Sequence, residues 1–179
     1  TRDKIQEEWR TAGELKPGDK IVLSNNRSIV WKGQGSFEEG YLLGLLIGDG
    51  VLTEERCIIS VWGDDEGAQS VMEAAEKAAY TLPHRNDFQG FNKAIEERKE
   101  HRLRLAALRD LASKYEIFPG NKRINESLER TSYDFHRGFL RGIFDADGTV
   151  TGDQEKGVSV RLWQKDAKGL KIIQRMLAR

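Results

Sequence analysis

The sequence predicts an α+β protein built from two related halves. Two apolar helical segments each end in Asp-Gly, and each is followed by a strand-like run that ends in tryptophan. An amphipathic helical pattern then follows each run, so the order helix, strand pair, helix occurs twice. An internal repeat of this kind indicates that the two halves share one supersecondary unit.

The residues before this repeat predict a separate segment. Pro17-Gly18 predicts a turn within residues 13–20, and the apolar triplet Ile21-Val22-Leu23 predicts a short strand. Residues 24–35 are mostly polar around the brief apolar stretch Ile29-Val30-Trp31 and are typical of a linker. We therefore place a domain boundary near residue 35.

The first copy of the repeat predicts a complete unit of helix, two strands, helix, two strands and helix. Its main segments are residues 40–50, 57–62, 66–79, 98–106 and 107–116, of which the fourth is a strand and the fifth a short helix. The segments of the second copy are residues 138–148, 157–163 and 166–178. We assign residues 36–131 to the first half and residues 132–179 to the second, which lacks its last hairpin and is expected to be truncated.

Composition excludes several classes of protein. A chain of 179 residues can bury a hydrophobic core, and its single cysteine, Cys57, excludes an internal disulfide framework and a cysteine-rich zinc site. No apolar run is long enough for a membrane span and no secretory leader is recognisable, so we expect a cytoplasmic protein with no membrane partner. The histidines show no metal-ligand spacing.

Charge is balanced overall but uneven along the chain. The sequence has 29 basic and 29 acidic residues. Residues 54–78 contain seven acidic and two basic residues, whereas residues 84–141 contain thirteen basic and nine acidic ones. A basic surface is therefore compatible with a net charge of zero. Such segments are common in highly charged chains, so this pattern alone does not select nucleic acid as the partner.

Small residues mark one face of each helix that ends in Asp-Gly. Gly44 and Gly48 lie four residues apart, as do Gly142 and Ala146, so each pair lies on one side of its helix. Helices that contact through small residues can approach closely. If the two copies pack through these faces, the terminal carboxylates of Asp49 and Asp147 arrive side by side.

A carboxylate pair of this kind predicts a metal site. Two adjacent carboxylates repel each other unless a cation lies between them. Magnesium is commonly held by one or two carboxylates together with substrate phosphates. We therefore expect Mg²⁺ to be bound by Asp49 and Asp147 with the preceding Gly48 and Ala146, in a site suited to phosphodiester hydrolysis. The alternative is that each Asp-Gly merely ends a helix, which the repetition of the pattern in both copies disfavours.

These two segments carry a family resemblance. Leu42-Leu-Gly-Leu-Leu-Ile-Gly-Asp-Gly50 and Leu140-Arg-Gly-Ile-Phe-Asp-Ala-Asp-Gly148 resemble the two signature helices of LAGLIDADG homing endonucleases. The resemblance covers residues 36–179 and indicates a single-chain enzyme with two motifs. It implies two pseudo-symmetric αββαββα halves joined by the signature helices, with saddle-shaped sheets that lie on a double-stranded DNA target.

The resemblance also implies further site residues. The segment Gly120-Asn-Lys-Arg-Ile-Asn-Glu-Ser-Leu128 is similar to the family's segment with a basic residue before an Ile-Pro pair, which makes Lys122 the candidate catalytic lysine; Asn125 replaces the usual proline. Such a lysine stabilises negative charge near the phosphate. Gln164 matches the position of a polar residue that orients a hydrolytic water. Gly63 corresponds to it in the first copy, so the two half-sites are expected to differ.

A second resemblance concerns the N-terminal segment. Trp9-Arg-Thr-Ala-Gly-Glu-Leu-Lys-Pro-Gly-Asp-Lys-Ile21 is similar to the part of an intein that leaves the splicing domain for an inserted endonuclease. Residues 36–44 are similar to ribonucleotide reductase inteins. The resemblance implies that residues 1–35 are a splicing-domain remnant and that an intein splicing domain of the same precursor is a partner. The chain has no His-Asn pair at its end and is not expected to splice by itself.

Strand positions supply the candidate DNA contacts. Arg102, Arg104 and Arg161 lie in predicted strands, which can enter the major groove, and Lys165 follows the second strand run. Each of these can equally be an exposed strand residue. Trp62 and Trp163 can stack on bases, but we expect both to lie in the core.

The sequence therefore predicts a monomeric, magnesium-dependent, site-specific DNA endonuclease encoded by an intein. Two alternatives remain open. One is a LAGLIDADG-fold module that binds DNA or RNA without chemistry, which the presence of both Asp49 and Asp147 disfavours. The other is a degenerate structural insertion in an intein, which the missing last hairpin favours.

Overall fold

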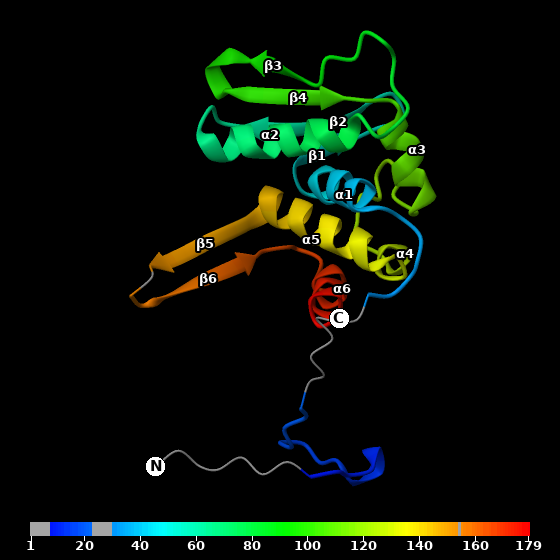
Figure 1. Ribbon diagram of the computed structural model, residues 1–179, viewed down its shortest axis with the longest axis vertical. Coiled ribbons are helices and arrows are strands. Elements are labelled where there is room, and N and C mark those ends of the chain that lie inside the picture. Colours follow the sequence, from blue (N-terminus) through cyan, green and yellow to red (C-terminus); the bar gives the residue numbers. More distant parts are fainter. Residues whose placement is uncertain (1–7, 23–29, 154) are drawn as a thin grey trace.

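The computed structural model describes residues 8–22, 30–153 and 155–179. The helical elements are η1 (Ala12–Glu14), α1 (Phe37–Asp49), α2 (Glu66–Ala79), η3 (Glu96–Arg98), α3 (Ala107–Lys114), α4 (Glu126–Glu129), α5 (Tyr133–Asp147) and α6 (Ala167–Leu177). The strands are β1 (Gly50–Leu52), β2 (Cys57–Trp62), β3 (Phe91–Ile95), β4 (Glu100–Arg104), β5 (Gly148–Asp153) and β6 (Gly157–Leu162). The predicted α+β class is confirmed (Figure 1).

The helices α1 and α5 lie side by side at the centre of the molecule (Figure 1). Glycines at four-residue spacing bring their backbones together. A Cβ atom on Gly44 would lie 2.5 Å from the Phe139 carbonyl oxygen, and one on Gly142 would collide with the Tyr41 carbonyl oxygen. The close packing predicted from the small residues is therefore confirmed, and Gly40 and Gly138 extend it by one turn on each helix.

Local sequence defines both ends of these two helices. Ser36 caps α1 by accepting a hydrogen bond from the Glu39 backbone N–H, and the Glu39 carboxylate accepts from the Ser36 N–H. Ser132 caps α5 in the same way through the Phe135 N–H. Each helix ends where a glycine adopts extended backbone and begins the next strand. The two terminal aspartates therefore lie at the same end of the helix pair.

The first half forms a four-stranded antiparallel sheet in the order β1-β2-β4-β3. The helices α1, α2 and α3 pack together with this sheet, and their apolar faces contribute to the core. Ile59, Leu103 and Leu108 are completely buried within it. The predicted order of helix, two strands, helix, two strands and helix is present in this half.

Among its described residues, the second half contains one hairpin, β5–β6, which projects away from α5 (Figure 1). Val150 and Val160 are opposite each other on one face of this hairpin and are 68% and 60% exposed. The helix α6 packs near α4 and α5 instead of covering the hairpin. Its Arg175 donates two hydrogen bonds to the Glu129 carboxylate in α4.

The N-terminal segment departs from expectation at one point. The turn at Pro17-Gly18 is closed by a hydrogen bond from the Asp19 N–H to the Lys16 carbonyl. Ile21 and Val22 are exposed and lie outside any strand, so the predicted strand is wrong for these two residues, because they pair with no described strand. Leu23 and Ile29 lie outside the described residues.

Residues after this gap contact the second half. The Trp31 indole N–H donates a hydrogen bond of 3.0 Å to the Thr131 carbonyl, and the Trp31 ring packs edge-on against Tyr133 and His136. The Ser132 N–H donates to the Gln34 carbonyl. The segment before α1 is thereby attached to the start of α5. Within the described residues, no helix has the length and apolar character needed to cross a membrane.

Candidate catalytic site at the helix seam

The structure brings Asp49 and Asp147 together where α1 and α5 end. Both residues are half-buried. The Asp147 Oδ2 atom lies 3.2 Å from the position that a Cβ atom would take on Gly48, and Ala146 contacts the same position. The two carboxylates interact across a seam that has no room for larger side chains at Gly48.

The environment of this pair disfavours two full negative charges. Burial and, second, the negative charge of Asp147 raise the pKa of Asp49 to about 6, whereas the positive charge of Lys122 acts in the opposite direction. At neutral pH the site therefore holds negative charge that is poorly solvated. A bound cation would relieve this repulsion.

The Lys122 side chain reaches the seam from the loop between α3 and α4. Its ammonium group donates hydrogen bonds to the carbonyl oxygens of Gly50, at 2.5 Å, and Gly48, at 3.3 Å. Burial lowers the pKa of Lys122, and the charges of Asp147 and Asp49 oppose that effect. A cationic group that is already desolvated beside two carboxylates is placed to stabilise charge on a phosphate.

The Gln164 side chain reaches the seam from the segment after β6. Its Nε2 group donates a short hydrogen bond to Asp147 Oδ2. The structure thus brings together all four side chains that were predicted as catalytic: Asp49, Asp147, Lys122 and Gln164. Asp49 and Lys122 come from the first half, and Asp147 and Gln164 come from the second half.

Asn125, in place of the expected proline, has a structural role. Its Oδ1 atom accepts hydrogen bonds from the backbone N–H groups of Ser127 and Leu128 and so caps α4. Its Nδ2 group donates to the carbonyls of Tyr115 and Glu116. These bonds fix the end of the loop that carries Lys122, and the amide supplies rigidity that a proline ring would otherwise give.

The donor set at the seam fits a hard divalent cation. Asp49 and Asp147 offer carboxylate oxygens, and the Gly48 carbonyl, a predicted ligand, already accepts from Lys122. Across the described part of the chain, no group of three or more His, Cys, Asp or Glu residues is arranged to hold a metal. Magnesium is compatible with two carboxylates because it retains waters and shares phosphate oxygens.

The predicted DNA-contact residues lie in different environments. Arg102 is half-buried and forms two hydrogen bonds to Glu100, whose carboxylate also accepts from the Ser60 hydroxyl. Arg104, Arg161 and Lys165 are exposed. The pairing of Arg102 with Glu100 was missed at the sequence level, although residues two apart on a strand point to the same face.

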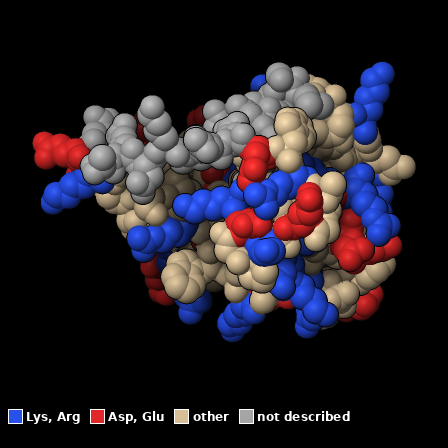
Figure 2. Space-filling model, turned by 90° about the horizontal axis from the view of Figure 1, so that it is seen from below, with Lys and Arg blue, Asp and Glu red and all other residues tan. Residues whose placement is uncertain are grey.

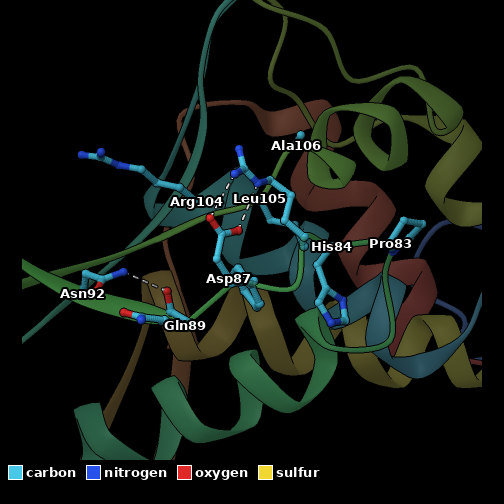
Figure 3. A pocket seen from close by; sticks show the side chains of 11 residues that line it. Pro83, His84, Asp87, Gln89, Asn92, Arg104, Leu105 and Ala106 are labelled. Carbon is cyan, nitrogen blue, oxygen red and sulfur yellow. Dashed lines mark hydrogen bonds and ion pairs between the residues drawn. The ribbon is translucent and has the colours of Figure 1, made fainter.

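Arg104 borders a shallow cavity of about 520 Å³ beside the sheet (Figure 3). The other side of this cavity is formed by the loop before β3, where Arg85 and Asp87 form an ion pair. Gln89 and Asn92 also line the cavity. On the face shown in Figure 2, basic side chains are interleaved with acidic ones and do not form a patch of a single sign.

The prediction that Trp62 and Trp163 lie in the core is wrong. Trp62 is 47% exposed and Trp163 is 76% exposed. Trp62 is the last residue of β2, and Trp163 directly follows β6. The apolar composition of the strand runs suggested burial, but each ring lies at or just past the end of its strand, where it is open to solvent.

Strand register also changes how the two halves correspond. Gly50 pairs with Ile59, whereas the equivalent Gly148 pairs with Leu162. Ile59 precedes Trp62 by three residues, but Leu162 precedes Trp163 by one. Counted from the paired glycines, Gln164 therefore corresponds to Val61 and not to Gly63. An alignment of the halves that matches Trp62 with Trp163 therefore differs by two residues from the alignment by strand register. The difference arises because β5 is six residues long and β1 only three.

Comparison with known proteins gives two results. The chain is 26% identical over 132 residues to DNA-directed RNA polymerase subunit Rpo1C of Methanocaldococcus jannaschii. That match covers 73% of this chain, which spans 15% of the length of this relative. A family model described as a LAGLIDADG-like domain matches residues 134–179, which cover α5 from its second residue together with β5, β6 and α6. Residues 134–179 are therefore similar to a LAGLIDADG-like domain, and the part of α5 that lies in this matched region carries Asp147.

Proposed function

We propose that this chain is a site-specific DNA endonuclease that hydrolyses phosphodiester bonds of double-stranded DNA with the help of magnesium. The observation that carries the proposal is the meeting of Asp49 and Asp147 at one end of the helix pair, next to Lys122 and Gln164. These groups are oxygen ligands, a cation and an amide, which together meet the needs of phosphodiester hydrolysis.

Each residue has a defined role in this proposal. Asp49 and Asp147 hold magnesium, which when bound activates water and stabilises the leaving oxygen. The Lys122 ammonium group stabilises negative charge on the phosphate. Gln164 orients the water through its amide while its N–H group remains on Asp147.

The exposed basic residues of the strands supply DNA contacts in this proposal. Arg104 and Arg161 lie on β4 and β6, and Lys165 follows β6 near the seam. Arginine on a strand can bind guanine with two hydrogen bonds in the major groove. Arg102 contributes through the donors that its pairing with Glu100 leaves available.

We also propose an intein origin for the chain. Residues 1–35 would then be the splicing-domain remnant, and residues 36–131 and 132–179 the two halves of an endonuclease that acts as a single chain. The similarity of residues 9–21 to the exit segment of an intein splicing domain supports this proposal.

Metal binding can be tested without DNA. Magnesium that binds only the folded protein raises the unfolding temperature. We expect millimolar Mg²⁺ to raise the unfolding temperature of the wild-type protein but not that of Asp49→Asn or Asp147→Asn. Asp153→Asn, at the exposed tip of the β5–β6 hairpin, is the matched control and should respond like the wild type. Equal responses of all four proteins would refute the metal site.

Cleavage is tested on a pool of plasmids that carry a randomised segment, with sequencing of the cut ends. We expect cleavage at a recurrent sequence in Mg²⁺ and none in chelator. Lys122→Met should slow cleavage by about 100-fold or more, because it removes one electrostatic stabiliser of the phosphate. Sequence-selective binding without any cleavage would instead support a binding module.

A further inference from the structure

A glutamate is buried on the outer face of the four-stranded sheet, which is the face turned away from the core. Leu103 of β4 is completely buried in the core, so its neighbours Arg102 and Arg104 lie on the outer face. Glu100 shares that face with them, and Trp62 of β2 is opposite it. Arg104 is exposed and Trp62 is 47% exposed, whereas Glu100 is only 5% exposed. A glutamate is almost never fully buried unless it is paired.

Two side chains pair with the Glu100 carboxylate. Arg102 donates from Nε to Oε1 at 2.7 Å and from Nη2 to Oε2 at 3.0 Å. The Ser60 hydroxyl, on the neighbouring strand β2, donates to Oε1 at 3.0 Å. The bonds from Arg102 and then from Ser60 hold the pKa of Glu100 below its usual range against the effect of burial, so the carboxylate is charged at neutral pH. Arg102 is therefore held along one edge by a fixed anion.

This ion pair joins no separate parts of the fold. Glu100 and Arg102 are two residues apart on β4, and Ser60 is already opposite Arg102 in the backbone pairing of β2 with β4. The desolvation of a buried ion pair offsets much of its attraction, so stability gives little account of this one. What the pair does determine is the orientation of the Arg102 guanidinium group.

The pairing leaves a second edge of the Arg102 guanidinium group available. The group carries five N–H donors in one plane, and Glu100 takes one on Nε and one on Nη2. One N–H of Nη2 and one of Nη1 remain side by side, without a hydrogen bond to any described residue. The Arg102 side chain is 30% exposed. Two parallel donors match O6 and N7 of guanine, the two acceptors on its major-groove edge.

We propose that Glu100 is a positioning residue, which fixes Arg102 so that it recognises one guanine in the major groove of a duplex. This inference rests on the proposed function, of which it uses only the binding of DNA. An arginine that is oriented before binding loses less side-chain entropy on contact, so its preference for a matching base is expressed more fully. Because the Glu100 carboxylate also repels phosphates, it lowers general affinity for DNA while it raises selectivity.

Arg104 is the contrasting residue on the same strand and face. It is exposed, and its guanidinium group forms no hydrogen bond with another described residue. An arginine without an anchor attracts the phosphates of any sequence, and a lysine at its position would do the same. Arg104→Lys is therefore the matched control for Arg102→Lys, since both substitutions keep the charge and remove the planar fork.

The test measures base preference separately from cleavage. The full chain, in chelator, is equilibrated with a pool of duplexes that carry a randomised segment, and the bound fraction is sequenced. We expect one position at which guanine is preferred over each other base by about 10-fold or more, the usual range for a bidentate contact. Arg102→Lys should abolish the preference at this position alone, whereas Arg104→Lys should retain it.

Glu100→Gln distinguishes a positioning role from a structural one. Loss of the negative charge should strengthen binding to DNA of unrelated sequence, yet reduce the guanine preference by about 5-fold, the effect of one lost hydrogen bond. Glu97→Gln removes the same charge from an exposed residue of η3, just before β4, and should leave the guanine preference unchanged. A substitution that only loosened the sheet would instead weaken binding to every sequence.

Two results would overturn the inference in different ways. A recurrent bound sequence whose guanine preferences are the same in the wild type, Arg102→Lys and Glu100→Gln would refute the role of both residues and leave the endonuclease proposal intact. Binding without any sequence preference, together with no cleavage of the randomised plasmid pool, would refute the endonuclease proposal and the guanine contact with it.

Discussion

At the scale of single residues, the raised pKa of Asp49 makes the stability of the protein depend on pH. Its carboxylate is half-buried beside Asp147 and has a pKa of about 6. The folded protein therefore binds a proton at this position more tightly than the unfolded chain, in which an aspartate has a pKa of about 3.9. Asp49 consequently contributes stability that is present below pH ~4 and lost as the pH rises through 6.

This linkage predicts that Asp49→Asn stabilises the metal-free protein. We expect its free energy of unfolding to exceed that of the wild type by about 1 kcal/mol at pH 7, a value reduced from the full linkage because the group is partly exposed. At pH 4 the two proteins should be nearly equal. Urea unfolding in chelator at both pH values measures the difference, with the exposed Glu55→Gln as control. A wild type more stable than the variant at pH 7 would contradict the prediction.

At the scale of elements, the seam between α1 and α5 has no room for a side chain at its glycines. Its helices approach so closely that a Cβ atom added to Gly44 or Gly142 would collide with backbone atoms of the partner helix. This packing sets the position of both terminal carboxylates. The β5–β6 hairpin is the opposite case, because its valine face has no described segment packed over it.

The close packing at the seam predicts that replacing one of its glycines by alanine lowers the stability of the protein. In an exposed helix, replacing glycine by alanine stabilises by about 1 kcal/mol. For Gly44→Ala we expect destabilisation of about 2 kcal/mol, because the new Cβ meets the Phe139 carbonyl and the helices must separate. Gly67→Ala, in the exposed first turn of α2, is the control and should be neutral or stabilising. Chemical denaturation of both variants compares them, and a stabilised Gly44→Ala would show that the seam is looser than described.

At the scale of the whole molecule, residues far apart in the chain are joined by Trp31. Its indole group bonds to Thr131 and packs on Tyr133 and His136, one hundred residues away. The His136 ring in turn bonds to the Glu129 carbonyl, next to the pairing with Arg175 of α6. The segment before the first half is thus attached to the start of the second half.

Removal of this attachment should destabilise the whole molecule. We expect Trp31→Ala to lower the free energy of unfolding by about 2 kcal/mol, less than for a fully buried tryptophan because this ring is partly exposed. Trp9→Ala, whose side chain is fully exposed, should change stability by less than about 0.5 kcal/mol. Guanidinium unfolding monitored by circular dichroism gives both values, and equal stability of the two variants would show that Trp31 does not hold the segment.

Much of the fold followed from periodicity and from the two Asp-Gly helix ends. The helix boundaries of α2 and α6 and the close approach at the seam were predicted because they depend on local patterns and residue size. The strand register of β5–β6 was not predictable in this way. Matching tryptophans ignores hairpin length, and a shift of two residues preserves which face each side chain occupies.

The sequence by itself determined the order of elements, the small-residue seam and the two carboxylates that end its helices, since these depend on spacing along a single helix. Only the tertiary structure decided that Lys122 is anchored on the carbonyls around Asp49, that Gln164 bonds to Asp147 and that both tryptophans are exposed. The two contacts join segments that lie apart in the chain, and the exposure of the tryptophans depends on what packs over the strands. Their geometry is set by packing, which no local pattern encodes.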